Sequence, residues 1–188
     1  MENENSTFSS PDFMKAESNR SNRLLLMRHA KSDWCVGQGD FERTLAPRGI
    51  KDAIAMGKWL AKIGLPDVIV CSPSRRTRET VELLSEVTRT KLCELTEFVD
   101  GLYHSSTESI LQSITDHSYK GSVMVIGHNP GLEQLLLWLI VDNKALKSFQ
   151  NPFPTAAIYE LSTTDPLNAL KENSALLLSF MRPKMIEN

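Results

Sequence analysis

The sequence predicts an α/β protein with three layers (α/β/α), in which helices cover both faces of a mostly parallel central sheet. Short apolar runs of strand length alternate along the chain with segments whose apolar residues recur at helical spacing. Such alternation is typical of a largely parallel sheet that is buried on both sides. The chain has 188 residues, which fits one domain, and we expect that domain to span residues 23–188.

Residues 1–22 are expected to form a flexible tail in front of the domain. They are rich in serine and include four acidic residues, but they contain no continuous apolar stretch. This composition is that of a solvated segment and does not match a secretory signal or an arginine-rich transit peptide.

The composition argues against several classes of protein. Hydrophobic residues make up 41% and charged residues 23% of the chain, as in ordinary globular proteins. The net charge of −2 argues against a strongly basic nucleic-acid binder. The longest apolar run, Leu135–Val141, is shorter than the roughly 20 residues that span a membrane. Three cysteines without CxxC spacing indicate neither a disulfide framework nor a zinc site, so we expect a cytoplasmic protein.

The first predicted elements are a strand, a helix and a second strand. The apolar run Leu24–Met27 has the length of a strand rather than a helix. Apolar residues at helical spacing predict a helix over residues 48–63, which ends before Gly64. The run Asp67–Cys71 predicts the second strand.

Capping patterns predict the next two helices. Ser72 as N-cap, with Pro73 in the first turn, opens a helix that ends near Val87. Ser105 and Glu108 have the spacing of a capping box in front of another helical segment.

The last predicted elements continue the alternation. Ser122–Ile126 is a third buried strand. Asn129 and Pro130 again combine a cap with a proline, and a stripe of leucines follows at helical spacing. Two further strands are expected at residues 156–161 and 175–180.

Polar clusters follow the three best-defined strands. Arg28 and His29 follow the first strand, Ser72–Arg76 the second, and His128 the third. Right-handed connections place the carboxyl ends of parallel strands at one edge of a sheet, where ligands bind. We therefore expect two histidines and at least two arginines to converge.

Such a cluster is suited to phosphate chemistry. Arginine offers a planar fork of donors that matches phosphate oxygens, and helix N-termini add free N–H groups. No P-loop, metal-ligand cluster or GxGxxG motif accompanies these residues, so we expect no metal or other cofactor. A neutral imidazole can itself act as the nucleophile and form a covalent phosphohistidine.

The segments around these residues resemble the histidine phosphatase (phosphoglycerate mutase-like) superfamily, and especially its SixA-type phosphohistidine phosphatase branch. Each matching motif is short, but several occur in the family's order, and the resemblance runs from about residue 23 to residue 180. The matching segments are residues 26–32, 40–49, 72–80, 127–131 and 151–156.

The resemblance implies a role for each matching position. His29 would be the nucleophile, Arg28 and Arg76 would bind the phosphoryl oxygens, and His128 would complete the pocket. Arg43 would be a further phosphate or substrate contact. Of the clustered arginines we choose Arg76, which lies four residues after the serine that opens its motif.

Two positions depart from the family pattern. Larger branches use a glutamate as proton donor, and no segment here matches it; we expect Asp100 in this role, with Glu97 as the nearest alternative. Many relatives carry asparagine six residues after the nucleophile, where this chain has Cys35. That contact is therefore lost or replaced.

The remaining notable side chains are expected to have structural or solvated roles. His104 and His117 lie in polar surroundings and are expected on the surface, whereas Trp59 and Trp138 are expected in the core. Trp34 either lines the mouth of the pocket or packs against it, and both readings stay open. Arg75 and Arg78 are expected to be surface charges.

A cysteine-dependent phosphatase was a rival possibility that the spacing excludes. Such enzymes place an arginine six residues after the catalytic cysteine. Cys71 is followed at that distance by Thr77, and the other two cysteines also lack the arginine. Cys71 is better interpreted as the buried end of a strand.

The expected function is hydrolysis of a phosphorylated protein, with phosphohistidine as the substrate class that the resemblance implies. The reaction would pass through a covalent phospho-His29 without a metal. Two alternatives stay open: a phosphomonoesterase acting on a small phosphorylated metabolite, and a phosphate-binding signalling module without turnover. A mutase would need extra segments to hold a bisphosphate. Neither nucleic acid nor a membrane is expected as a partner.

Overall fold

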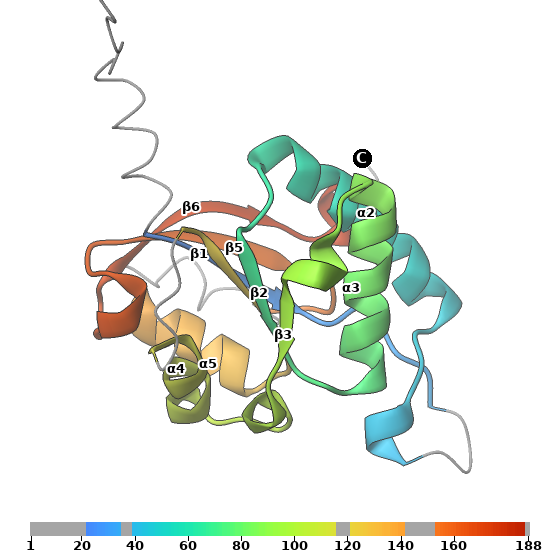
Figure 1. The fold of residues 1–188 in the computed structure, drawn as a ribbon, viewed down its shortest axis with the longest axis horizontal. Coiled ribbons are helices and arrows are strands. Elements are labelled where there is room, and N and C mark those ends of the chain that lie inside the picture. The colour runs from blue at the N-terminus through green and yellow to red at the C-terminus, as the bar shows by residue number, and fades with distance from the viewer. Residues whose placement is uncertain (1–21, 35–38, 116–120, 142–152, 187–188) are drawn as a thin grey trace, which may run out of the picture.

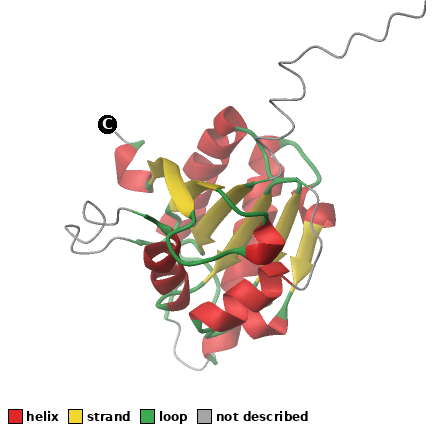
Figure 2. Ribbon diagram, turned by 90° about the vertical axis from the view of Figure 1, so that its left-hand side faces the viewer, coloured by secondary structure: helices red, strands yellow, loops and turns green. Residues whose placement is uncertain are grey.

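The computed structural model describes residues 22–34, 39–115, 121–141 and 153–186. Within these residues one six-stranded sheet lies between two layers of helices (Figures 1 and 2), so the predicted α/β class and layering are confirmed. The tail expected over residues 1–22 lies outside the described residues, apart from Asn22. No helix in the described part of the chain is long and apolar enough to cross a bilayer.

The sheet is mixed. Its strands are β1 (Arg23–Arg28), β2 (Val68–Cys71), β3 (Thr96–Phe98), β4 (Val123–Gly127), β5 (Ile158–Thr163) and β6 (Ala175–Met181), in the order β3-β2-β4-β1-β5-β6. The first four pair in parallel, whereas β5 pairs antiparallel with both β1 and β6. The sequence pattern does not predict β3, because two of its three residues are polar.

Two helices cover each face of the sheet. The helices are α2 (Pro47–Ile63), α3 (Arg75–Thr88), α4 (Thr107–Thr115) and α5 (Gly131–Leu139). Helices α2 and α3 pack together on one face, and α4 and α5 on the other (Figure 1). Along β1, Leu24 and Leu26 point into the core formed with α4 and α5, and Leu25 points into the core formed with α2 and α3. Burial on both faces explains the unbroken apolar run of this strand.

Helix α3 begins at Arg75, later than its predicted start at Pro73. The N-cap is Ser74, whose carbonyl oxygen accepts the N–H of Arg78 at 3.1 Å. The Ser72 hydroxyl, which we expected to cap the helix, instead makes a hydrogen bond with His128. The serine at the strand end therefore belongs to the polar cluster, and the helix starts after it.

The caps of the next two helices are also shifted by one residue. The hydroxyl that accepts an N–H in the first turn of α4 belongs to Ser106 rather than Ser105. Helix α5 has Pro130 rather than Asn129 as its N-cap, and these two residues are joined by a cis peptide bond. A side chain at Gly131, the first residue of α5, would clash with the carbonyl oxygen of Ser105, so this helix start requires glycine.

Strands β2, β4 and β1 are parallel neighbours, so their carboxyl ends share one edge of the sheet. At that edge the N–H of His29 donates to the carbonyl of Gly127 at 3.1 Å. The N–H of Ser72 donates to the carbonyl of Ile126 at 3.0 Å. The polar clusters that follow the three strands therefore meet, as their order in the sequence predicts.

Candidate active site

A cavity of about 340 Å³ opens at this edge of the sheet. Four of its side chains are cationic and one is a carboxylate, so it favours an anion. It is lined by Arg28, His29, Lys31, Ser32, Trp34, Asp40, Arg43, Arg76, His104, His128, Asn129 and Thr155. Of the site residues that the sequence predicts, only Asp100 is absent from this lining.

The loop that carries His29 is held against the start of α2. The carbonyl oxygen of Lys31 accepts the N–H of Ala46, the N-cap of that helix, at 2.9 Å. A side chain at Gly49 would clash with the same carbonyl, so glycine permits this close packing. The start of α2 thus fixes the backbone immediately after the predicted nucleophile.

One hydrogen bond sets the tautomer of His29. Its Nδ1 lies 2.7 Å from the carbonyl oxygen of Ala30. Because a carbonyl oxygen only accepts, Nδ1 carries the proton and Nε2 keeps a lone pair. The Ala30 backbone is itself held, since its N–H donates to the Thr80 hydroxyl at 3.1 Å. The ring is therefore oriented with a free nucleophilic nitrogen.

The environment of His29 keeps the imidazole neutral. The residue is 7% exposed. Burial, followed by the neighbouring His128 ring and the charge of Arg76, holds the pKa of His29 well below its usual value of 6.5. The lone pair on Nε2 is consequently available at neutral pH.

His128 faces His29 with a ring-centroid distance of 5.0 Å. Its Nδ1 accepts a hydrogen bond from Nη2 of Arg76 at 3.3 Å, so its Nε2 carries the proton and donates to the Ser72 hydroxyl at 2.8 Å. Burial, and then the charge of Arg76, lower the pKa of His128 to about 3. This histidine is therefore also neutral and fixed in one tautomer.

Arg28 and Arg76 approach the cavity from different strand ends and are each held by a backbone carbonyl. Nη1 of Arg28 donates to Phe153 at 2.9 Å, and Nη1 of Arg76 donates to Asp40 at 2.6 Å. The Nε of each guanidinium is buried and has no hydrogen-bond partner among the described residues. Two buried donors without acceptors are costly unless an anion binds between these side chains.

Asp40 joins the arginines of the site. Its carboxylate accepts hydrogen bonds from Arg43 at 2.9 Å, from Arg76 at 3.1 Å and from the Tyr103 hydroxyl at 2.7 Å. Burial alone would raise the pKa of Asp40, but the bonds from Tyr103 and Arg43 outweigh it and hold the pKa well below its usual range. The carboxylate is thus ionised and orients both guanidinium groups. The sequence pattern did not single out Asp40, although it lies three residues before Arg43.

Arg43 is buried at the mouth of the cavity. Its Nη2 donates to the Ser32 hydroxyl at 2.7 Å, and its guanidinium lies 3.5 Å from the centre of the Trp34 ring. Trp34 is 70% exposed and lines the cavity, so of its two predicted roles it has the one at the mouth of the pocket.

The predicted proton donor is not brought to the cavity. Asp100 is exposed in a short 3-10 helix, Asp100–Leu102, and neither it nor Glu97 in β3 lines the cavity. The residues that follow this helix reach the site instead: the Tyr103 hydroxyl donates to Asp40, and His104 lines the cavity. The residues that reach the site therefore follow the C-terminal end of this helix, whereas Asp100 is at its start.

His104 lines the cavity, although the sequence analysis places it among ordinary surface residues. Its Nε2 lies 3.5 Å from Oδ2 of Asp40, and its ring is 4.2 Å from that of Tyr103, measured between centroids. Its backbone φ of 52° is in the left-handed region, which is strained for a residue with a side chain. Such strain often occurs where a side chain must be aimed at a site.

Arg75 and Arg78 do not line the cavity, and both are exposed, as predicted. Arg75 is paired with Glu79 at 2.9 Å, and Arg78 packs on the Phe98 ring at 3.9 Å. Cys35 and His117 lie outside the described residues. Within the described ranges, no group of three or more histidine, cysteine or acidic side chains is arranged to hold a metal ion.

Comparisons with known proteins agree with this geometry. The model of the histidine phosphatase superfamily (branch 1) matches residues 24–108. The uncharacterized protein Rv1276c of Mycobacterium tuberculosis is 28% identical over 84% of this chain and 100% of its own length.

Two solved structures share the fold over most of both chains. The presumed phosphohistidine phosphatase SixA of Agrobacterium tumefaciens is 28% identical, with a TM-score of 0.72 over 85% of this chain and 97% of its own. Its presumed counterpart from Nakamurella multipartitia is 29% identical, with a TM-score of 0.70 over 86% of this chain and 96% of its own.

Proposed function

We propose that the chain is a histidine phosphatase, on the match to the family model and the fold that it shares with SixA-type structures, and that it hydrolyses protein phosphohistidine through a phosphorylated His29. The observation that carries the proposal is the neutral His29, whose Nε2 is free in a cavity lined by two incompletely bonded arginines. We further propose one domain over residues 23–188, acting in the cytoplasm, where the free thiols of Cys71 and Cys93 stay reduced.

In the first step, the lone pair of His29 Nε2 attacks the phosphorus atom of the substrate. The P–Nε2 bond forms as the bond between phosphorus and the substrate's leaving nitrogen breaks. Arg28 and Arg76 bind the phosphoryl oxygens, on which negative charge is distributed in the transition state. Arg43 acts mainly through Asp40, whose carboxylate accepts hydrogen bonds from Arg43 and Arg76 and holds both side chains in place.

The leaving nitrogen needs a proton, and we assign that proton to His104. Asp40 is ionised and therefore has none to give, while the proton on Nε2 of His128 is already donated to Ser72. His104 lines the cavity, and the Asp40 carboxylate lies beside its Nε2, so this side chain is placed to pass a proton to the leaving group. This assignment replaces Asp100, whose carboxylate lies away from the cavity.

In the second step, water attacks the phosphorus atom and the P–Nε2 bond breaks. His104, deprotonated by the first step, takes the proton of the attacking water. Inorganic phosphate leaves, and both histidines return to their starting states. The cycle needs no electron transfer and no second substrate.

The choice of phosphohistidine rests on two supports. Two similar structures carry the name phosphohistidine phosphatase SixA. The mouth of the cavity is also lined by the rings of Trp34 and His104, against which a planar imidazole leaving group can pack.

The direct test measures phosphate release in the presence of EDTA, from a phosphohistidine peptide and from a phosphomonoester. We expect EDTA-resistant turnover with the higher kcat/KM on the peptide, and a loss of roughly 10⁴-fold or more in His29→Ala. Preference for the phosphomonoester would make the chain a small-molecule phosphatase instead. Tight phosphate binding without turnover of either substrate would make it a binding module.

A further inference from the structure

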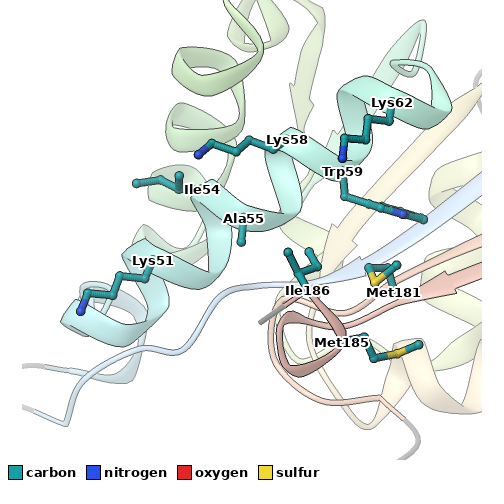
Figure 3. A pocket seen from close by; sticks show the side chains of 9 residues that line it. All are labelled: Lys51, Ile54, Ala55, Lys58, Trp59, Lys62, Met181, Met185 and Ile186. Atoms are coloured by element: carbon teal, nitrogen blue, oxygen red, sulfur yellow. The ribbon is translucent and has the colours of Figure 1, made fainter. Parts of the chain in front are cut away.

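A second cavity, of about 560 Å³, lies between α2 and the C-terminal end of β6 (Figure 3). Its floor is apolar: the side chains of Trp59, Met181 and Ile186 lie together between the helix and the C-terminal segment. Ile186 is 38% exposed, so this apolar surface is open to solvent. We call this cavity the α2 groove, and its size is that of a ligand-binding pocket.

Three lysines line the α2 groove. Lys51, Lys58 and Lys62 are spaced so that all lie along one side of α2, and each is exposed. None of them pairs with a carboxylate among the residues that the structure describes. A partner that fits this groove therefore needs both apolar side chains and negative charge.

A smaller cavity lies next to both the α2 groove and the active-site cavity. Thr155 lines both the active-site cavity and this intermediate cavity of about 140 Å³. Arg182 and Lys184 also line it, and in the chain they lie between the groove residues Met181 and Met185. The α2 groove and the intermediate cavity are thus neighbours between α2 and residues 181–186, and the intermediate cavity has three cationic side chains and one carboxylate, Asp52. We call the three cavities together the trough.

The length of the trough indicates what kind of molecule it accommodates. Arg48 lines the intermediate cavity and Lys62 lies at the far end of the groove. These two residues are about 21 Å apart along a helix, at 1.5 Å per residue. An extended peptide of roughly six or seven residues covers that distance. A small phosphorylated metabolite bound at His29 would leave it unused.

We propose that this trough is the docking surface for an acidic segment with interspersed apolar residues, which flanks the phosphorylated histidine of a protein substrate. The proposal rests on the proposed function, because it takes the phosphoryl group to be bound at His29. The apolar side chains of the segment would pack on Trp59 and Met181, and its carboxylates would pair with the lysines of α2. Docking would lower KM and leave the chemical step unchanged.

The test compares two synthetic peptides that carry the same phosphohistidine. One continues into seven residues of alternating glutamate and leucine, and the other into alternating lysine and leucine. We expect kcat/KM to be about tenfold higher for the acidic peptide, mainly through KM. The variant K58E/K62E should lose or invert this preference, while its turnover of p-nitrophenyl phosphate stays that of the unmodified chain.

A matched control is K91E/K171E, which reverses two exposed lysines elsewhere on the surface. It should keep the preference for the acidic peptide. Equal kcat/KM values for the two peptides, or a preference that survives K58E/K62E, would overturn the docking proposal while leaving the proposed function intact. If neither peptide is hydrolysed, the proposed function fails and the docking proposal falls with it.

Measurements on the same two proteins, the unmodified chain and K58E/K62E, would also detect two other occupants of the α2 groove. Arg23, at the start of β1, donates to the carbonyl oxygens of Ile63 and Gly64, so the chain enters the sheet close to the end of α2. Carbodiimide cross-links between Lys58 or Lys62 and the acidic residues of segment 1–21 would assign the groove to the chain's own N-terminal segment. A dimer that dissociates in K58E/K62E would assign it to a second copy. Either result, without peptide discrimination, contradicts the proposal.

Discussion

His29 is made reactive by its neighbours rather than by any property of the ring alone. The Ala30 carbonyl holds the proton on Nδ1, and burial keeps the ring neutral, so Nε2 presents its lone pair to the cavity. His128 is fixed in the opposite tautomer, because Arg76 donates to its Nδ1. The two facing imidazoles therefore differ in the nitrogen that carries the proton, and only His29 has its lone pair free of any hydrogen bond that the structure shows.

The role of His104 makes a prediction that depends on the leaving group. His104→Gln should lower kcat on a phosphohistidine peptide by about 10²-fold, because the leaving nitrogen would no longer receive a proton. The same variant should release nitrophenolate from p-nitrophenyl phosphate almost normally in the first turnover, since nitrophenolate leaves as a stable anion and needs no proton. Asp100→Asn is the matched control and should leave both rates unchanged. Equal losses on both substrates in His104→Gln, or a selective loss in Asp100→Asn, would refute the assignment.

The lowered pKa of His128 predicts how stability depends on pH. In the unfolded chain this imidazole takes up a proton as the pH falls through about 6.5, but in the folded chain its pKa is about 3. The unfolded state therefore binds more protons between these values, and stability is lost as the pH falls. Linkage gives a loss of about 2 kcal/mol from this residue between pH 7.5 and pH 5.

Denaturant unfolding at several pH values measures this effect. His128→Asn should show a smaller loss of unfolding free energy on acidification than the unmodified chain, whatever its stability at pH 7.5. Parallel curves for the two proteins would show that His128 is not buried in its neutral form.

Residues of the site differ in how far the sequence could predict them. Arg28 ends a buried strand, and His29 and His128 directly follow one, so a strand pattern and parallel topology are enough to bring them together. Asp40 and His104 belong to irregular segments, and their partners are distant in the chain: Asp40 contacts Tyr103 across 63 positions. No local pattern encodes such a contact, so the sequence alone predicts Asp100 rather than His104 as the proton donor.

Among the secondary-structure elements, hydrophobic periodicity predicted the regular helices and missed a short strand. The helix expected over residues 48–63 is α2 with one residue added, because its apolar stripe faces a continuous core. Strand β3 has three residues and packs at the edge of the sheet, where little apolar surface is needed. Helices begin at other residues than predicted because polar side chains that could cap them make different hydrogen bonds. Ser72, for example, is hydrogen-bonded to His128.

The start of α5 provides a test at this scale. Gly131→Ala should destabilise the fold by about 1–3 kcal/mol, because the added methyl group clashes with the Ser105 carbonyl. Gly101→Ala is a suitable control, since a side chain at that position meets nothing within 4 Å. Denaturant unfolding of the two variants checks the difference. Equal stabilities would mean that the α4 and α5 starts are not packed as closely as described.

The whole molecule combines an almost balanced charge with a strongly cationic site. The net charge is −2, yet the active-site cavity holds four cationic side chains and one carboxylate. Attraction for phosphate is thus local and focused by the cavity rather than by the net charge of the chain. Six further cationic side chains and one carboxylate line the intermediate cavity and the α2 groove, which is the charge that the proposed acidic segment would meet.

The central claim is that turnover passes through a phosphoryl group on Nε2 of His29. Rapid acid-free quenching during turnover of a ³²P-labelled phosphohistidine peptide, followed by peptide mapping, measures it directly. We predict a label that is stable to alkali and labile to acid, located at His29 and absent from His29→Ala, which should also be inactive. A label on another residue, or undiminished phosphate release by His29→Ala, would contradict the mechanism.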